Sequence, residues 1–257
     1  MAKTIQEKLK PREKKEKGYL RLSSVGKPDR QLWYEVNEPQ SGEKLHPNAY
    51  MKFLLGDIVE EIVLFLAVIT GHKVTARQKE VKLNGVTGHT DAIIDGTLGD
   101  VKSASPFSFE KFEKGLTPEA DPFGYREQLQ GYLEALQDDD ELEDKNRAAF
   151  LALHKVTGDM ALDIHQKSSV PIRDIIEHKK EMVQRKEPPE RCYEPVPMGK
   201  SGNMKLNTQC SYCSFKNKCW PELRTFLYSS GPVFLTEVAK APDVPEISKD
   251  SKHKKEE

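Results

Sequence analysis

Two aspartates and a lysine within residues 88–102 are the side chains of this sequence best suited to chemistry. The segment contains Asp95-Gly96, a strong signal for a two-residue hairpin turn, because both central positions of such a turn favour positive φ. Counting back from the turn predicts that Asp91 lies opposite Asp100. Directly opposed Cβ atoms on one face of a sheet are about 4.5–5.5 Å apart. The hairpin therefore predicts two carboxylates side by side.

The lysine, Lys102, is expected to share a strand face with Asp100, because strand side chains alternate. The same pattern points Val101 to the core and places His89 opposite Lys102. Two carboxylates this close repel unless a cation neutralises them, and Mg²⁺ binds one or two carboxylates together with waters and a substrate phosphate. A metal beside a charged lysine indicates hydrolysis of a phosphodiester. The alternative is a solvated hairpin whose charges face water.

The helix predicted over residues 48–70 is the clearest in the sequence, because its apolar residues recur at helical spacing. Asp57, Glu60 and Glu61 fall on one sector of this helix. Glu60 could supply a third carboxylate to the metal. Alternatively, the acidic sector is only the solvated face of the helix.

A second predicted helix, over about residues 124–137, carries Gln128 and Tyr132. Their i, i+4 spacing makes them neighbours on one helix face. An amide and a phenol there could bind a phosphate or a base, or orient Lys102. Ordinary packing of the helix surface is the alternative.

The four cysteines, Cys192, Cys210, Cys213 and Cys219, form a second candidate site. A CxxC pair is a chelating geometry for zinc or iron, and zinc sites more often show two close pairs. One close pair and two single cysteines favour a cluster held by four thiolates. Zinc remains the alternative, and disulfides are disfavoured in a chain without a secretory segment.

Aromatic and basic residues surround these cysteines. A lysine-rich surface with exposed aromatic rings suits single-stranded nucleic acid, although the same residues would also pack around a metal. They are Tyr212, Phe215, Lys216, Lys218 and Trp220.

The net charge of the 257 residues is −1, so any contact with nucleic acid must come from a local patch. The longest apolar stretch, residues 58–69, contains glutamates and is too short to span a bilayer. We therefore expect a soluble, cytoplasmic protein that does not enter a membrane.

The order of the expected elements indicates an α/β fold followed by a cysteine-rich segment. A strand is expected over residues 73–83, a hairpin over 147–165 and a helix over 171–186. The expected organisation is a charged arm (1–17), a core (18–187), a cysteine-rich segment packed on the core (188–237) and a disordered tail (238–257).

The order of five short motifs resembles the PD-(D/E)XK nuclease superfamily, specifically its RecB-like branch, which includes CRISPR-associated RecB-like and phage exonucleases. The resemblance covers roughly residues 20–222 and implies a restriction-endonuclease-like α/β fold, with a mixed central sheet flanked by helices. The motifs are GxxxE (Gly56, Glu60), GHTD (Asp91), DVK (Asp100, Lys102), QxxxY (Gln128, Tyr132) and the CxxCxxxxxC group.

This resemblance implies a role for each matching residue. Glu60, Asp91 and Asp100 would ligate Mg²⁺ or Mn²⁺, Lys102 would position or activate the attacking water, and Gln128 and Tyr132 would orient Lys102 and the DNA. The four cysteines would hold a [4Fe-4S] cluster. Relatives often carry the first cluster cysteine near the N-terminus, where this chain has Ser23 to Tyr34 and no cysteine. Cys192 would replace it, which leaves the cluster type and its fourth ligand open.

The expected function is that of a metal-dependent deoxyribonuclease in DNA processing, recombination or repair, an exonuclease rather than an endonuclease. Its partner is DNA, with a helicase or recombination protein as a further candidate. One alternative is a catalytically silent nucleic-acid-binding or assembly subunit that keeps the nuclease fold. Another is a zinc-binding interaction module.

Overall fold

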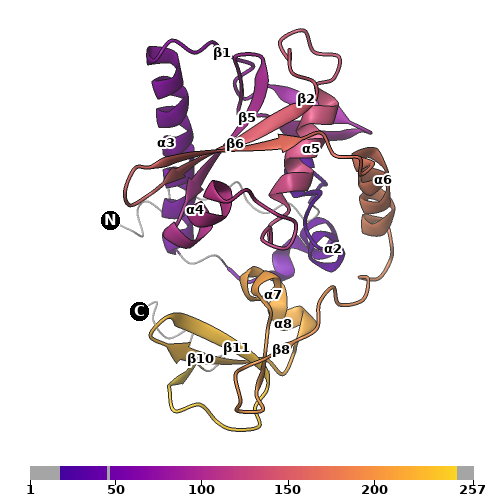
Figure 1. Ribbon diagram of the computed structural model, residues 1–257. Helices are drawn as coiled ribbons and strands as arrows, with labels where there is room; N and C mark the ends of the chain where they lie inside the picture. The colour runs from indigo at the N-terminus through magenta and orange to yellow at the C-terminus, as the bar shows by residue number, and fades with distance from the viewer. Residues whose placement is uncertain (1–17, 45–46, 248–257) are drawn as a thin grey trace.

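A five-stranded mixed sheet forms the centre of the computed structural model, which describes residues 18–44 and 47–247 (Figure 1). Its strand order is β1-β4-β5-β6-β7; β5 and β6 run parallel, and every other neighbouring pair is antiparallel. The strands are β1 (Val74–Thr75), β4 (Ala92–Ile94), β5 (Thr97–Ala104), β6 (Arg147–His154) and β7 (Met160–Gln166).

Helices flank this sheet, which confirms the α/β class expected from the sequence. The long helix α3 (Pro47–Ile69) contacts β1, β5 and β6, while α4 (Pro106–Glu113) and α5 (Tyr125–Ala135) pack against β6. The parallel pair β5 and β6 requires a crossover, and the chain makes it through α4 and α5. That connection brings α5 over the strand that carries Asp100.

A separate hairpin and several short helices pack beside the central sheet and α5. The hairpin of β2 (Glu80–Leu83) and β3 (Val86–His89) contacts α5 and the short 3₁₀ helix η1 (Leu22–Ser24). Helix α2 (Asp29–Asn37), followed by η2 (Pro39–Ser41), packs against α6 (Ile172–Val183).

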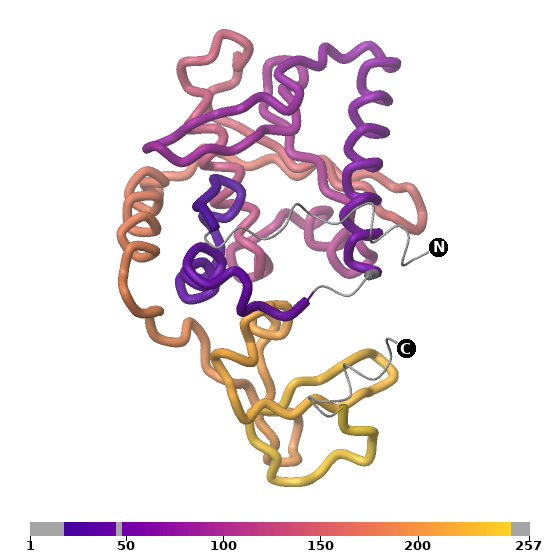
Figure 2. Tube along the Cα trace, turned by 180° about the vertical axis from the view of Figure 1, so that it is seen from behind, coloured from indigo at the N-terminus to yellow at the C-terminus, as the bar shows by residue number. Residues whose placement is uncertain are grey.

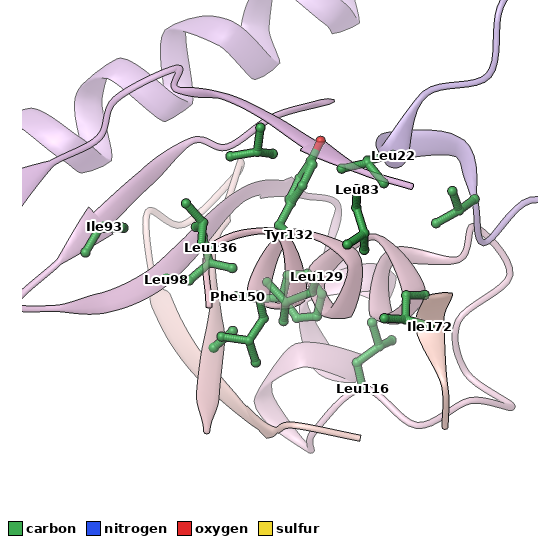
Figure 3. Close-up of a cluster of buried hydrophobic side chains, with 14 of the residues drawn as sticks. Leu22, Leu83, Ile93, Leu98, Leu116, Leu129, Tyr132, Leu136, Phe150 and Ile172 are labelled. Carbon is green, nitrogen blue, oxygen red and sulfur yellow. The ribbon is translucent and has the colours of Figure 1, made fainter. Parts of the chain in front are cut away.

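Two buried clusters hold these elements together. In the larger one, Tyr132 lies among Leu22, Leu83 and Leu129 (Figure 3). The smaller cluster joins α2, α6 and the cysteine-rich segment; its buried members are Leu32, Trp33, Tyr34, Met182, Val183, Cys213 and Phe215. The cysteine-rich segment is therefore anchored to α2 and α6. Figure 2 shows from behind that this segment lies directly below α2.

A second antiparallel sheet, which the sequence did not indicate, is built from two strands before the cysteine-rich helices and three strands after them. Its order is β12-β10-β11-β9-β8. The elements are β8 (Val196–Pro197), β9 (Met204–Lys205), α7 (Thr208–Tyr212), α8 (Lys216–Cys219), β10 (Arg224–Tyr228), β11 (Gly231–Glu237) and β12 (Glu246–Ile247).

Several expected boundaries differ from the structure. The tail expected from residue 238 is ordered through 247, because β12 pairs with β10 and Lys240 N donates to Asn203 Oδ1 at 2.9 Å. The single strand expected over 73–83 is divided into β1 and β2 by Ala76 and Gln78, which have positive φ. The hairpin expected over 147–165 is present as β6 and β7. The expected arm, 1–17, lies outside the described residues.

Among the described residues, none of the helices is both long enough and apolar enough to cross a bilayer.

Candidate functional site

The turn at Asp95-Gly96 forms as expected. The two residues have φ of 47° and 74°, and Ile94 pairs with Thr97 across them. The register continues to Ala92 opposite Gly99, where β4 begins. Asp91 lies one residue before β4, and its Oδ2 accepts a hydrogen bond from Val101 N at 2.7 Å. The side chain of Asp91 is thereby fixed beside the middle of β5.

The expected pairing of His89 with Lys102 is wrong. His89 pairs with Glu80 in the hairpin of β2 and β3. The chain turns between the two hairpins because Thr90 N donates to Lys79 O at 3.1 Å, and Asp91 O accepts from Gln78 N at 3.2 Å.

Asp100 is the most enclosed charged group of the site, with 1 % of its surface exposed. Gln128 Nε2 donates to its Oδ1 at 3.0 Å. Lys102 Nζ forms a close ion pair with its Oδ2. Val101 is only half-buried, so the expectation that it, rather than Asp100, faces the core is also wrong. The buried face of β5 carries the charges because α5 covers them.

The electrostatics of Asp91 show how close the acidic groups are. Burial, together with the charges of Asp100 and Glu60, raises the pKa of Asp91 to about 8, against the opposing effects of Lys102 and the Val101 N–H. These carboxylates therefore disfavour simultaneous ionisation unless a cation joins them.

Lys102 is held as a cation. Burial lowers the pKa of its ammonium group, but the charge and ion pair of Asp100 raise it by more, so that the net shift is upward from 10.5. Its Nζ also lies 4.5 Å from the ring centre of Tyr125 and 5.8 Å from that of Phe150. A protonated lysine in this setting can stabilise negative charge and is a poor proton acceptor.

Tyr125 is a site residue that the sequence analysis missed. It opens α5 and precedes Gln128 and Tyr132 by three and seven residues, a spacing that places all three on one helix face. That extended stripe was the signal that could have revealed it.

Gln128 and Tyr132 do reach the site, although Gln128 contacts Asp100 instead of Lys102. Tyr132 is buried, and burial together with Asp100 and Asp91 raises the pKa of its hydroxyl to about 12, opposed by Lys102 and a hydrogen bond with Ser23. Its ring fits against Gly88, where a Cβ would lie 2.6 Å from Tyr132 Cε1. The glycine of the GHTD motif therefore leaves room for this tyrosine.

Glu60 lies within electrostatic reach of the pair but is engaged elsewhere. Gln78 Nε2 donates to its Oε1 at 2.6 Å. Burial raises the pKa of Glu60, the Gln78 hydrogen bond lowers it, and the charges of Glu61, Asp100 and Asp57 raise it further, with a net upward shift.

The chemistry of these side chains fits a divalent metal only in part. Within residues 18–44 and 47–247, no three or more His, Cys, Asp or Glu side chains are already arranged to hold a metal ion. Asp91 and Asp100 nevertheless offer adjacent carboxylates, and Asp100 Oδ2 is buried without a hydrogen bond from the described residues. One or two carboxylates completed by water suffice for Mg²⁺.

The four cysteines meet at one small pocket, also lined by Pro28, Arg30 and Gln31. Arg30 N lies 3.4 Å from Cys192 Sγ, and Arg30 Nε lies 3.3 Å from Cys219 Sγ. The stretch that lacks the expected N-terminal cysteine thus lies directly against Cys192.

The sulfur atoms are thiols in this structure and influence one another. Burial raises the pKa of Cys210 to about 12, and the other three cysteines add to the effect. Burial likewise raises the pKa of Cys213 to about 11. Burial therefore keeps these two side chains as neutral thiols, and among the described residues the cysteines are not already arranged to hold a metal ion.

The exposed aromatic and lysine surface expected around the cysteines is largely wrong. Phe215 is buried and stacks on Tyr34 with ring centres 5.3 Å apart, while Lys216 is buried in an ion pair with Glu43. Trp220 lies under Arg191 at 4.0 Å. Phe215, Lys216 and Trp220 thus pack within the segment, whereas Tyr212, at 72 %, and Lys218 are exposed.

No protein-family model and no curated protein sequence matches the chain. Three solved structures resemble it partially. The protein SSO0001 is 16 % identical, with 84 % of this chain and 92 % of that one covered and a TM-score of 0.44. A phage-related exonuclease from Haemophilus somnus 129PT is 14 % identical, with 65 % and 92 % covered and a TM-score of 0.44. An alkaline exonuclease from Laribacter hongkongensis is 13 % identical, with 62 % and 87 % covered and a TM-score of 0.37. The sequence identities and TM-scores of these similarities are too low to assign the chain to a family.

Proposed function

We propose that this protein is a Mg²⁺- or Mn²⁺-dependent deoxyribonuclease that acts as an exonuclease. The observation that carries the proposal is the group of the buried Asp100 with the half-buried Asp91 and Lys102, in which Asp91 has a pKa raised to about 8 by burial, Asp100 and Glu60. A cluster of repelling carboxylates beside a fixed cation is costly to fold, so a ligand that neutralises it offers the best reason for its presence. The preference for exonuclease action follows from the motif resemblance alone.

Asp91 and Asp100 are the proposed metal ligands, and Glu60 is a third candidate that must leave Gln78 to join them. A bound divalent cation would neutralise charge developing on the phosphate and lower the pKa of a water molecule. Gln128 fixes the Asp100 carboxylate through its 3.0 Å hydrogen bond. Lys102, kept protonated by Asp100, is placed to stabilise the phosphate in the transition state.

We also propose a [4Fe-4S] cluster at the four cysteines, with Cys192 as the fourth ligand. Support comes from the shared pocket and from the contact of Arg30 N with Cys192 Sγ. Because the smaller buried cluster includes Cys213, this site would fasten the C-terminal segment to α2 and α6.

Single substitutions at Asp100 and Lys102 test the nuclease assignment. Asp100→Asn and Lys102→Met should each lower the rate of DNA degradation by about 100-fold or more, because an electrostatic contribution to the transition state is lost. The measurement uses end-labelled single- and double-stranded DNA with Mg²⁺ or Mn²⁺. Exposed positions provide matched controls, Asp140→Asn and Lys114→Met, which should retain wild-type rates.

Circular dichroism of each variant verifies that the fold persists. Cleavage at the wild-type rate by either site variant would contradict the assignment. Circular and linear forms of the same DNA separate the two modes of action, since an exonuclease degrades only the linear form.

A further inference from the structure

Three aromatic rings form a continuous path from Lys102 to the surface of the cysteine-rich segment. Tyr125 lies 4.5 Å from Lys102 Nζ. Phe123 contacts Tyr125 with ring centres 5.5 Å apart, and Tyr212 contacts Phe123 at 5.7 Å. We call Tyr125, Phe123 and Tyr212 the aromatic track. It connects the proposed active site to α7.

Exposure increases along the aromatic track. Tyr125 is partly buried, Phe123 is 40 % exposed and Tyr212 is 72 % exposed. If the contact between Phe123 and Tyr212 served only to pack α7 against the core, we would expect both of these rings to be buried. Here the rings meet at an interplanar angle of 66° and keep much of their surface in solvent.

The backbone around Phe123 is held by hydrogen bonds, although the ring of Phe123 is exposed. Asp121 Oδ1 accepts hydrogen bonds from Phe123 N at 3.2 Å and Gly124 N at 3.0 Å, and its Oδ2 accepts from Arg126 N at 2.9 Å. Gly124 has φ of 73° and lies so close to Gly26 that a Cβ would approach Gly26 C at 2.3 Å. The loop therefore has one defined conformation.

Tyr212 is presented by a capped helix. The side chain of Asn207 accepts from Cys210 N at 2.9 Å at the start of α7. Cys210 and Cys213 turn toward the cysteine pocket while Tyr212 remains in solvent. A backbone fixed in advance lowers the conformational entropy that is lost when the segment binds a ligand.

We propose that the aromatic track is a stacking platform for single-stranded nucleic acid that leads a strand to the proposed active site. This inference rests on the proposed nuclease function and names the form of its substrate. Every base has an aromatic face, so stacking binds a strand of any sequence. Paired bases inside a duplex already stack on one another, so their faces are not free to stack on these rings.

The test measures binding separately from cleavage. Fluorescence anisotropy of the full-length protein in EDTA reports binding of fluorescein-labelled oligothymidine of about 12 nucleotides and of a duplex of equal length. Phe123→Ala and Tyr212→Ala should each weaken binding of the single strand by about fivefold or more. Duplex binding should change much less.

Two variants control for structure and exposure. Tyr212→Phe keeps the ring and should bind as the wild type does. Phe107→Ala removes a ring that is also 72 % exposed but lies on α4 outside the track, and it should leave affinity unchanged. The iron content of the Tyr212 variants verifies that the neighbouring cysteines are undisturbed.

The outcomes distinguish this inference from the proposed function. Unchanged single-strand affinity in both alanine variants, or no single-strand binding by the wild-type protein, would overturn the platform, even if the wild type cleaves DNA with Mg²⁺. Weakened binding in the alanine variants with no cleavage by the wild type would support the platform and contradict the nuclease.

Discussion

Replacing Asp91 by asparagine should stabilise the metal-free protein while removing its response to metal. Burial, Asp100 and Glu60 raise the pKa of Asp91 from 3.8 to about 8 in the folded state. Asparagine keeps an oxygen that can accept the hydrogen bond from Val101 N, now 2.7 Å from Asp91 Oδ2. It introduces no charge beside Asp100. The substitution therefore removes repulsion and retains the local geometry.

The sign of the pH dependence follows from the upward shift of this pKa. Below pH 3.8 both folded and unfolded chains carry the proton, so the aspartate costs nothing. As the pH rises, the unfolded chain ionises first, and the cost to the folded state grows until about pH 8, where Asp91 ionises there too. At about 1.4 kcal/mol per pKa unit, the upper limit is about 6 kcal/mol, and a gain of about 1 to 6 kcal/mol is expected for asparagine.

Urea unfolding in EDTA measures this effect. The free energy of unfolding of Asp91→Asn should exceed that of the wild type clearly at about pH 8.5 and hardly at about pH 4. Asp140→Asn, in an exposed position, is the matched control, and its free energy of unfolding should equal that of the wild type at both pH values. Added Mg²⁺ should raise the melting temperature of the wild type and of Asp140→Asn, but not that of Asp91→Asn. An asparagine variant whose stability relative to wild type does not increase with pH would refute the reasoning.

Two further substitutions probe the packing of the site and the cysteine pocket. Gly88→Ala introduces a Cβ 2.6 Å from Tyr132 Cε1 and 2.8 Å from Leu22 Cβ, so urea unfolding should show a loss of about 1–3 kcal/mol. Gly56→Ala, with nothing within 4 Å of the new Cβ, should be neutral or stabilising; equal effects at both positions would contradict the steric argument. Cys192→Ser should remove most of the iron from anaerobically purified protein, as metal analysis and visible absorbance would show. Full iron in this variant would exclude Cys192 as a ligand, and stoichiometric zinc in the wild type would replace the cluster assignment.

The parts of the site that depend on local turn chemistry could be predicted from the sequence. Asp95-Gly96 specifies its turn through positive φ, and that turn alone sets the register as far as Ala92. The prediction failed at His89 because hydrogen bonds of Thr90 and Asp91 to a neighbouring segment turn the chain away from β5. Such a long-range competition has no signature in the spacing of the residues.

The burial and pairing of charged side chains could not be predicted from the sequence either. Lys216 belongs to a residue type that is mostly exposed, yet Glu43, far away in the chain, pairs with it in the interior. The strands β8, β9 and β12 have two residues each, too few for an alternating pattern to appear. Their pairing partners in the second sheet define them instead.

The contacts of Arg30 with Cys192 and Cys219 form only late in the synthesis of the protein. Its sulfur partners, Cys192 and Cys219, follow 162 and 189 residues later, so α2 leaves the ribosome long before them. Pairing over such separations slows folding more than it weakens the final structure. Nascent chains thus carry α2 without these contacts until Cys192 and Cys219 have been synthesised. If a cluster completes the pocket, scarcity of iron in the cell would reduce the yield of mature protein before it altered the rate of any reaction.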